Sequence, residues 1–291
     1  MTDKRQKPNL FIVGAMKSAT TSLHNYLDLH PEVFMSKDPW KEPGFFVREL
    51  NLAKGMDWYL SLFSGVTAVH KVIGESTTDY TKRPNYDGVA ERIFEFNPAA
   101  KIIYIMRDPI ERSISHYWWE VAYSSEGRDM LTAMRKVDWI SNTSNYAMQL
   151  KPYLDLFKKE NVYTLTTEAL SGNPDQCLSD IFRWLGVKDD FKLPELGRHN
   201  ESRPVINQFI GARYISWLRG GMLWNAIKKI VPAGLRRKIL AKYTRPVERN
   251  NDSRDETIRY LQPIMREQVA ELSDLLGGRQ FPEWETLYKD V

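Results

Sequence analysis

One stretch near the start of the chain, residues 9–29, limits the folds open to it more than any other part of the sequence. The stretch reads NLFIVGAMKSATTSLHNYLDL. Its apolar, β-branched run LFIV predicts a buried strand that ends at Gly14. A short polar loop follows, and Leu23, Tyr26 and Leu27 then recur at the spacing of one helix face. The stretch therefore predicts a strand, a loop and a helix in direct succession.

The loop has the form of an anion-binding site. A strand that turns through small residues into a helix directs backbone N–H groups and the positive end of the helix dipole toward one point. Lys17 adds a full charge there. Loops that bind nucleoside triphosphates read G-x-x-x-x-G-K-[ST], whereas Lys17 follows Gly14 by three residues with no glycine directly before it. The loop predicts a phosphate or sulfate site, and a turn with an incidental lysine is the alternative.

The remaining pattern predicts an α/β fold with a central parallel sheet flanked by helices. Further strands are expected at 71–74, 101–106 and 161–166, and helices at 56–63, 87–96, from 109 onward, at 146–157, 173–185 and 255–276. Residues 30–46 contain three prolines and no periodicity, so they predict a long ordered loop. Because strands alternate with helices, we expect a P-loop-like three-layer sandwich with a helical C-terminal extension.

Polar residues follow two of the predicted strands, at the edge where open parallel sheets bind ligands. The run ESTT at 75–78 ends one strand, and Arg107 ends another. Arginine offers a planar fork that suits phosphate, and Ser115 lies about two turns along the next helix. Arg107 and Ser115 could therefore meet at one ligand. A capping salt bridge among Arg107, Asp108 and Arg112 is the alternative.

A charged pair, Lys41 and Glu42, lies near the end of the predicted loop. Phe45 and Phe46 follow closely, and buried aromatic rings there would anchor the loop and hold the two charges in place. A solvated surface pair is the alternative.

Composition narrows the class of protein. The 291 residues are 42% hydrophobic, which suits one large core, and we expect a single domain over 1–291. The one cysteine, Cys177, excludes an intrachain disulfide and a cysteine metal cluster, and the five histidines lack ligand spacing, so no metal is expected. A polar amino terminus and the lack of an apolar run of about 18 residues predict a cytoplasmic protein without a signal or membrane anchor.

Positive charge gathers in one late segment. Residues 210–250 contain ten lysines and arginines against a single acid, Glu248. We expect a basic helical insertion or lid at 206–250. Its basic residues and its tryptophans, Trp217 and Trp224, suit an amphipathic acceptor or a peripheral contact with an anionic membrane. A solvated face is the alternative, and nucleic acid is not expected because no recognition motif accompanies the charge.

Four segments, in order, resemble the sulfotransferases that use 3′-phosphoadenosine 5′-phosphosulfate (PAPS). They are GAMKSATTSL at 14–23, KEPGFF at 41–46, GESTTDY at 74–80 and IYIMRDPIERSISHYW at 103–118. The second resembles the K-E-P-x-F-F segment of the heparan-sulfate-type branch. The resemblance covers about residues 9–205. It implies sulfuryl transfer from PAPS to an acceptor hydroxyl, which leaves 3′,5′-adenosine bisphosphate as product and uses no metal.

The resemblance also implies roles for individual residues. The 5′-phosphosulfate would be held by Lys17, Ser18, Ala19, Thr20, Thr21 and Ser22. The 3′-phosphate would be held by Arg107 and Ser115, with Gly197 and Arg198 resembling a later loop that closes over the nucleotide. Lys17 would stabilise the leaving phosphate and Glu42 would be the general base. Lys41 would help to place Glu42 or bind the sulfonate, and His116 is the second candidate base.

Departures from the branch argue against a heparan-type acceptor. Gly44 and Val47 stand where the branch often has a histidine and an acid, and Ser76 stands where it often has a lysine. Two other functions stay open, a P-loop phosphotransferase such as a nucleotide kinase and a non-catalytic anion- or lipid-binding protein. Dependence on Mg²⁺ would favour the first, and PAPS binding without transfer would favour the second.

Overall fold

The computed structural model describes residues 7–37, 41–124, 126–191, 205–209, 244–249 and 252–290. Gly197, Arg198 and most of the basic segment 206–250 lie outside the described residues. The predictions made for them stay predictions.

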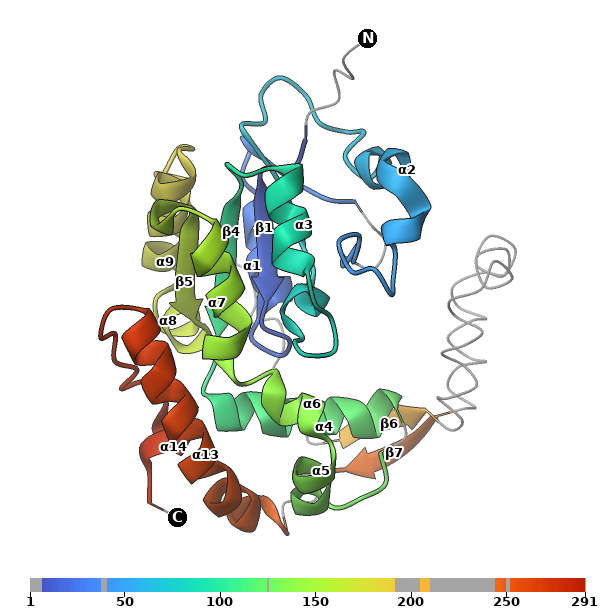
Figure 1. The fold of residues 1–291 in the computed structure, drawn as a ribbon, viewed down its shortest axis with the longest axis vertical. Helices are drawn as coiled ribbons and strands as arrows, with labels where there is room; N and C mark the ends of the chain where they lie inside the picture. Colours follow the sequence, from blue (N-terminus) through green and yellow to red (C-terminus); the bar gives the residue numbers. More distant parts are fainter. Residues whose placement is uncertain are drawn as a thin grey trace.

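The centre of the molecule is a five-stranded parallel sheet, as the sequence predicts (Figure 1). Its strand order is β2-β3-β1-β4-β5, and every adjacent pair is parallel. The strands are β1 (Leu10–Gly14), β2 (Val33–Met35), β3 (Val72–Ser76), β4 (Lys101–Met106) and β5 (Val162–Thr166). Strand β2 corrects one expectation, because it lies within residues 30–46, which predicted only a loop. Its three residues are too few to show a period, and pairing with β3 makes them a strand.

Helices cover both faces of the sheet, which confirms the three-layer α/β fold. The helices are α1 (Thr20–Asp28), α2 (Gly55–Ser61), α3 (Val89–Phe96), α4 (Pro109–Tyr123), α5 (Met130–Lys136), α6 (Asp138–Asn142), α7 (Tyr146–Leu156), α8 (Thr167–Gly172), α9 (Pro174–Leu185), α13 (Arg254–Leu275) and α14 (Glu285–Tyr288). Short 3-10 turns are η1 (Leu52–Lys54), η2 (Thr78–Thr81) and η3 (Lys159–Asn161).

Alternate residues of β1 divide the core into two parts. Leu10 and Ile12 pack with residues of α1 and α9 on one face, whereas Phe11 and Val13 pack with residues of α3, α4, α7 and α13 on the other. Helix α13 ends before Gly277 and forms the predicted C-terminal helical layer against α7 (Figure 1). The sheet is therefore buried on both sides, as parallel sheets usually are.

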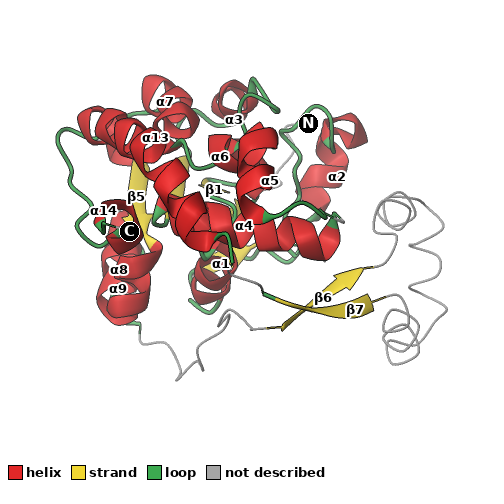
Figure 2. Ribbon diagram, turned by 90° about the horizontal axis from the view of Figure 1, so that it is seen from below, coloured by secondary structure: helices red, strands yellow, loops and turns green. Residues whose placement is uncertain are grey.

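The described ends of the basic segment are strands rather than the expected helices. Strand β6 (Val205–Phe209) pairs in antiparallel fashion with β7 (Thr244–Glu248), and Figure 2 shows the two as a separate ribbon beside α4. The two strands are far apart in the sequence, so no short turn signal joins them. Local patterns could not predict the pairing for this reason.

Candidate active site

The loop between β1 and α1 presents polar groups at the carboxyl edge of the sheet. Lys17 and Ala19 have positive φ angles of 71° and 61°, a conformation that is strained for residues with side chains and clusters at functional sites. The N–H groups of residues 20–22 belong to the first turn of α1, so they have no partner within the helix. No side-chain cap and no acidic residue in that turn takes the place of one. The buried hydroxyl of Ser18 has no hydrogen-bond partner among the described residues. The six residues predicted to hold the phosphosulfate therefore lie together in an anion-binding geometry.

The charges of three arginines act on Lys17 and make this edge of the sheet positive. Burial, followed by the charges of Arg249, Arg107 and Arg112, lowers the pKa of Lys17 to about 8. The same positive charges that disfavour the protonated lysine favour a bound anion, because an anion would relieve their mutual repulsion. We call Lys17, Arg107, Arg112 and Arg249 the cation cluster.

Arg107 lies two residues before α4, and Glu111 and Ser115 follow it at intervals of four residues along the chain. Arg107 Nη2 is 3.9 Å from Glu111 Oε2, and Ser115 follows Glu111 by about one turn. Glu111 also accepts a hydrogen bond of 2.5 Å from Arg254, so its charge is shared between two arginines. Asp108 caps α4 with its side chain, but the ion pair of Arg107 is with Glu111. The guanidinium of Arg107 thus keeps capacity for a further anion.

Arg112 is completely buried and supports the Lys17 loop from behind. Its guanidinium donates to the carbonyl oxygens of Met16 and Ile140 and, over 2.5 Å, to Ser144 Oγ. These acceptors are neutral, so the side chain contributes charge to the cation cluster while it fixes the loop backbone. The sequence alone had suggested a role for Arg112 only in a capping salt bridge.

Arg249 is a member of the cation cluster that the sequence did not single out. It directly follows β7, its guanidinium lies 5.9 Å from the centre of the Trp118 ring, and its Nε atom is buried without a hydrogen-bond partner among the described residues. Nothing in the sequence distinguishes it from the other basic residues of 210–250. Its position depends on the pairing of β6 with β7.

The Lys41–Glu42 pair contacts the start of α1. Lys41 Nζ lies 3.2 Å from Glu42 Oε1 and donates over 3.2 Å to both Thr20 Oγ1 and Thr21 Oγ1 at the start of α1. Only 13% of the Lys41 side chain is exposed, and burial lowers its pKa. Glu42 Oε2 accepts from the backbone N–H of Thr78 over 3.3 Å and from Thr78 Oγ1 over 2.8 Å. The pair therefore connects the start of α1 to η2, and differs from the solvated surface pair that was the alternative.

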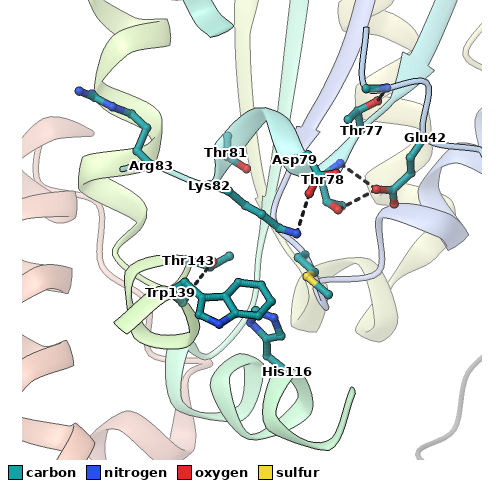
Figure 3. Close-up of polar contacts among 12 residues, drawn as sticks. Glu42, Thr77, Thr78, Asp79, Thr81, Lys82, Arg83, His116, Trp139 and Thr143 are labelled. Carbon is teal, nitrogen blue, oxygen red and sulfur yellow. Dashed lines mark hydrogen bonds and ion pairs between the residues drawn. The ribbon is translucent and has the colours of Figure 1, made fainter. Parts of the chain in front are cut away.

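Charged and aromatic side chains continue from Glu42 along η2 (Figure 3). Asp79 Oδ1 lies 2.6 Å from Lys82 Nζ, and this ammonium lies 5.5 Å from the centre of the Trp139 ring. Figure 3 shows Lys82 between the end of η2 and the side chains of Trp139 and His116. The region beside Glu42 thus offers a donor, an acceptor and an aromatic face.

His116 is completely buried, and both of its ring nitrogens face other side chains. Arg112 Nη1 lies 3.1 Å from Nδ1, and Glu120 Oε1 lies 3.4 Å from Nε2. Because a guanidinium can only donate, Nδ1 is the acceptor and the proton of the neutral ring is on Nε2. Burial, Arg112 and Lys82 lower the pKa of His116 far below its usual range. The ring therefore packs beneath the cation cluster as a neutral group.

The described parts of the chain lack two features, a helix that could span a membrane and a cluster of side chains that could hold a metal ion. No helix there is both long and apolar enough to cross a bilayer. Nor do three or more histidine, cysteine, aspartate or glutamate side chains gather there in a way that could hold a metal ion.

Comparison with known proteins assigns this arrangement to a family. The family profile described as "Sulfotransferase domain" matches residues 7–200, more than half of the chain. The chain belongs to this sulfotransferase family. A crystallised sulfotransferase from Alicyclobacillus acidocaldarius superposes on it with a TM-score of 0.70 and 24% identity, covering 96% of this chain and 99% of the other. That likeness shows a shared fold.

Two curated proteins resemble parts of this sulfotransferase. The membrane-associated sulfotransferase kil1 of Dictyostelium discoideum is 36% identical over 120 residues, which cover 40% of this chain and 24% of kil1. The bifunctional heparan sulfate N-deacetylase/N-sulfotransferase 1 of Caenorhabditis briggsae is 26% identical over 209 residues, which cover 64% of this chain and 23% of that protein. The matches thus span about a quarter of each relative.

Proposed function

We propose that this sulfotransferase moves the sulfuryl group of PAPS to a hydroxyl of an acceptor by in-line displacement. One observation carries the proposal. Lys41 joins a carboxylate, Glu42, to the two threonines that begin α1, so a candidate base lies beside the anion-binding loop. In-line transfer needs an acceptor and a donor held on opposite sides of one centre, and this connection brings the two binding regions together.

The residues at the carboxyl edge fit a nucleotide with phosphate groups at both ends. Residues 17–22 offer N–H groups, hydroxyls and one ammonium for the 5′-phosphosulfate, and the buried, unpartnered hydroxyl of Ser18 would gain an acceptor there. Arg107 and Ser115 would bind the 3′-phosphate, and Arg249 adds a second guanidinium. PAPS supplies an activated sulfuryl group. Lys17, as a cation, stabilises negative charge that develops on the departing phosphate.

Glu42 is the base in this proposal. The acceptor oxygen forms its bond to sulfur as the bond between sulfur and the phosphate oxygen breaks, and the hydroxyl proton passes to the Glu42 carboxylate. Lys41 and Thr78 hold that carboxylate in place. His116 is less suited to this role, because Arg112 already occupies its Nδ1 lone pair.

The acceptor would lie beside η2, between Glu42 and the Asp79–Lys82 pair. This pair and the half-buried Trp139 suit an acceptor with both polar and apolar parts. One relative is named for heparan sulfate and another as membrane-associated, so we test both glycan and lipid acceptors. Gly44, Val47 and Ser76 argue against a heparan-type acceptor. Peripheral contact with an anionic membrane through the basic segment is a further part of the proposal. Lack of pelleting with vesicles of phosphatidylserine and phosphatidylcholine would remove that part.

The test is transfer of label from [³⁵S]PAPS in EDTA to a defined panel of O-desulfated heparan oligosaccharides, N-acetylglucosamine, p-nitrophenol, dodecanol and phosphatidylinositol. We expect one class to be labelled by the wild-type protein. Glu42→Gln should lower turnover at least about 100-fold while affinity for 3′,5′-adenosine bisphosphate is kept. Wild-type turnover by Glu42→Gln would contradict the assignment of the base, and the absence of label in every acceptor would count against the proposed transfer.

A further inference from the structure

A buried carboxylate, Glu75, lies beneath residues 41–46, which we call the Glu42 loop. It takes no part in the proposed transfer chemistry. It sits on β3 and is completely buried. Its Oε1 accepts from Tyr59 Oη over 2.7 Å and from Tyr80 Oη over 2.8 Å, and its Oε2 accepts from Thr77 Oγ1 over 2.7 Å. Both oxygens of this buried carboxylate therefore accept hydrogen bonds from neighbouring hydroxyls.

Two of these three hydroxyls also bind the backbone of the Glu42 loop. Thr77 Oγ1 accepts from the N–H of Gly44 over 3.2 Å, and Tyr80 Oη accepts from the N–H of Phe46 over 3.4 Å. A backbone N–H can only donate a hydrogen bond, and a hydroxyl has a single proton. Each hydroxyl therefore accepts from the loop and directs its proton to Glu75. The acceptor oxygens of Glu75 complete both of these hydrogen-bond relays.

Ring packing connects the same residues. The Phe45 ring stacks on Tyr59 at 4.4 Å with an interplanar angle of 9°, and the Phe46 ring meets Tyr80 edge-on at 5.9 Å. Tyr59 and Tyr80, which donate to Glu75, therefore also pack against the rings of Phe45 and Phe46. Both the polar and the apolar attachments of the loop lead to this one carboxylate.

The side chain of Glu42 is held by the residue next to this network. Thr78, which donates to Glu42 Oε2 from both its backbone and its hydroxyl, directly follows Thr77 in the chain (Figure 3). A change in the position of Thr77 would therefore act on the Glu42 carboxylate through η2, as well as through Gly44.

We propose that Glu75 is a positioning residue for Glu42. Its buried carboxylate accepts from Thr77 and Tyr80 and so orients them to hold the loop backbone at Gly44 and Phe46. This holds the Glu42 carboxylate where an acceptor hydroxyl can meet it. The inference rests on the proposed function in taking Glu42 as the base. The relay itself can be tested without any acceptor.

Amide hydrogen exchange of the full-length protein reads the relay at its two ends. In Glu75→Gln the carboxamide nitrogen replaces one acceptor oxygen and directs hydrogens at hydroxyls that donate in the wild type, so exchange at Gly44, at Phe46 or at both should accelerate at least about tenfold. Thr77→Val removes only the relay to Gly44 and should accelerate exchange there and not at Phe46. It also carries the test if Glu75→Gln does not fold. Thr257→Val, equally buried on α13, is the matched control. Wild-type exchange at Gly44 in Thr77→Val, or at both amides in a folded Glu75→Gln, would overturn the proposal.

Turnover on the best acceptor of the panel then separates positioning from a merely structural role. We expect Glu75→Gln to lower kcat about 10- to 100-fold, with affinity for 3′,5′-adenosine bisphosphate within about twofold of the wild type. In the Glu42→Gln background it should have no further effect. An equal loss in both backgrounds, or an unchanged kcat, contradicts the positioning role. Wild-type turnover by Glu42→Gln, or no turnover on any acceptor, contradicts the proposed function instead, and hydrogen exchange still decides on the relay.

Discussion

At the scale of single residues, Lys17 shows how burial and neighbouring charges shift a pKa in the site. Its backbone has a positive φ, and its ammonium lies in the field of three arginines, which together with burial lowers its pKa to about 8. A lysine with so low a pKa is still mainly protonated at neutral pH. Lys17 loses its proton slightly above neutral pH, so the affinity of the site for an anionic ligand should depend on pH.

We predict that affinity for 3′,5′-adenosine bisphosphate falls as the pH rises through about 8. Below that pH Lys17 is charged and attracts the nucleotide, and above it the free enzyme must take up a proton before it binds, so affinity falls by up to about tenfold per unit. Isothermal titration calorimetry between pH 6.5 and 9.5 measures this. In Lys17→Met the affinity should be lower throughout and the change near pH 8 should be absent. A wild-type affinity that is constant across this range would contradict the prediction.

Motif residues and contact residues differ in how well the sequence predicts them. Lys17, Arg107 and Glu42 could be proposed because each lies in a recognisable local pattern, and the structure brings their surroundings to one edge of the sheet. Arg249 could not, because its contacts depend on chain segments that meet only after folding. Thr78 was visible as one of the polar residues at a strand end, but its hydrogen bonds to Glu42 were not. Glu75 was visible as a polar residue at a strand end, but its hydrogen bonds to Tyr59 and Tyr80 were not.

At the scale of elements, the β1–α1 turn is fixed by close contact with η2 and β4. A Cβ atom added at Gly14 would lie 2.0 Å from Thr81 Oγ1 and 2.8 Å from a ring carbon of Tyr104. Thr81 Oγ1 in turn donates to the carbonyl of Val13 over 2.7 Å. Gly14 is therefore needed for the close approach of these elements, in addition to any role in the loop.

We predict that Gly14→Ala lowers the free energy of unfolding by about 1–3 kcal/mol, because the added methyl group displaces Thr81 and Tyr104. Urea unfolding followed by circular dichroism measures the change. Gly172→Ala is the matched control, since a Cβ atom there would meet nothing within 4 Å. Equal stability of Gly14→Ala and the control would show that the turn can relax without cost.

Elements with a clear period were predictable, and elements defined by partners were not. The run KIIYIM predicted β4 with its observed bounds, and the periodic apolar positions of α13 predicted that helix to within one residue at each end. Strand β2 has three residues, and β6 and β7 are separated by a long insertion. Their extended conformation comes from pairing, which a local pattern does not contain.

At the scale of the whole molecule, the cation cluster gathers residues from separate parts of the chain. Lys17 comes from the β1–α1 loop, Arg107 from the short link between β4 and α4, Arg112 from α4, and Arg249 from the residue after β7. The ribbon thus contributes to the edge of the sheet where the donor is proposed to bind, although the interior of the basic segment lies outside the described residues.

We predict that Arg249→Ala lowers affinity for 3′,5′-adenosine bisphosphate about 10- to 100-fold, because a charge-assisted contact to phosphate is lost. Arg183→Ala is the control, since Arg183 lies on α9 and pairs at the surface with Asp180 and Asp189. Calorimetry at low ionic strength compares the two variants with the wild type. An affinity of Arg249→Ala equal to that of Arg183→Ala would remove Arg249 from the site.

The edge around Lys17 and Arg107 is proposed to bind a 3′,5′-bisphosphate nucleotide in preference to a nucleoside triphosphate. The most direct measurement is calorimetric titration of the full-length protein with 3′,5′-adenosine bisphosphate in EDTA and, separately, with ATP and Mg²⁺. We predict that the bisphosphate binds at least about tenfold more tightly, and that Lys17→Ala and Arg107→Ala each reduce this affinity at least about tenfold. Tighter binding of ATP with Mg²⁺, or bisphosphate binding that neither variant weakens, would contradict the account.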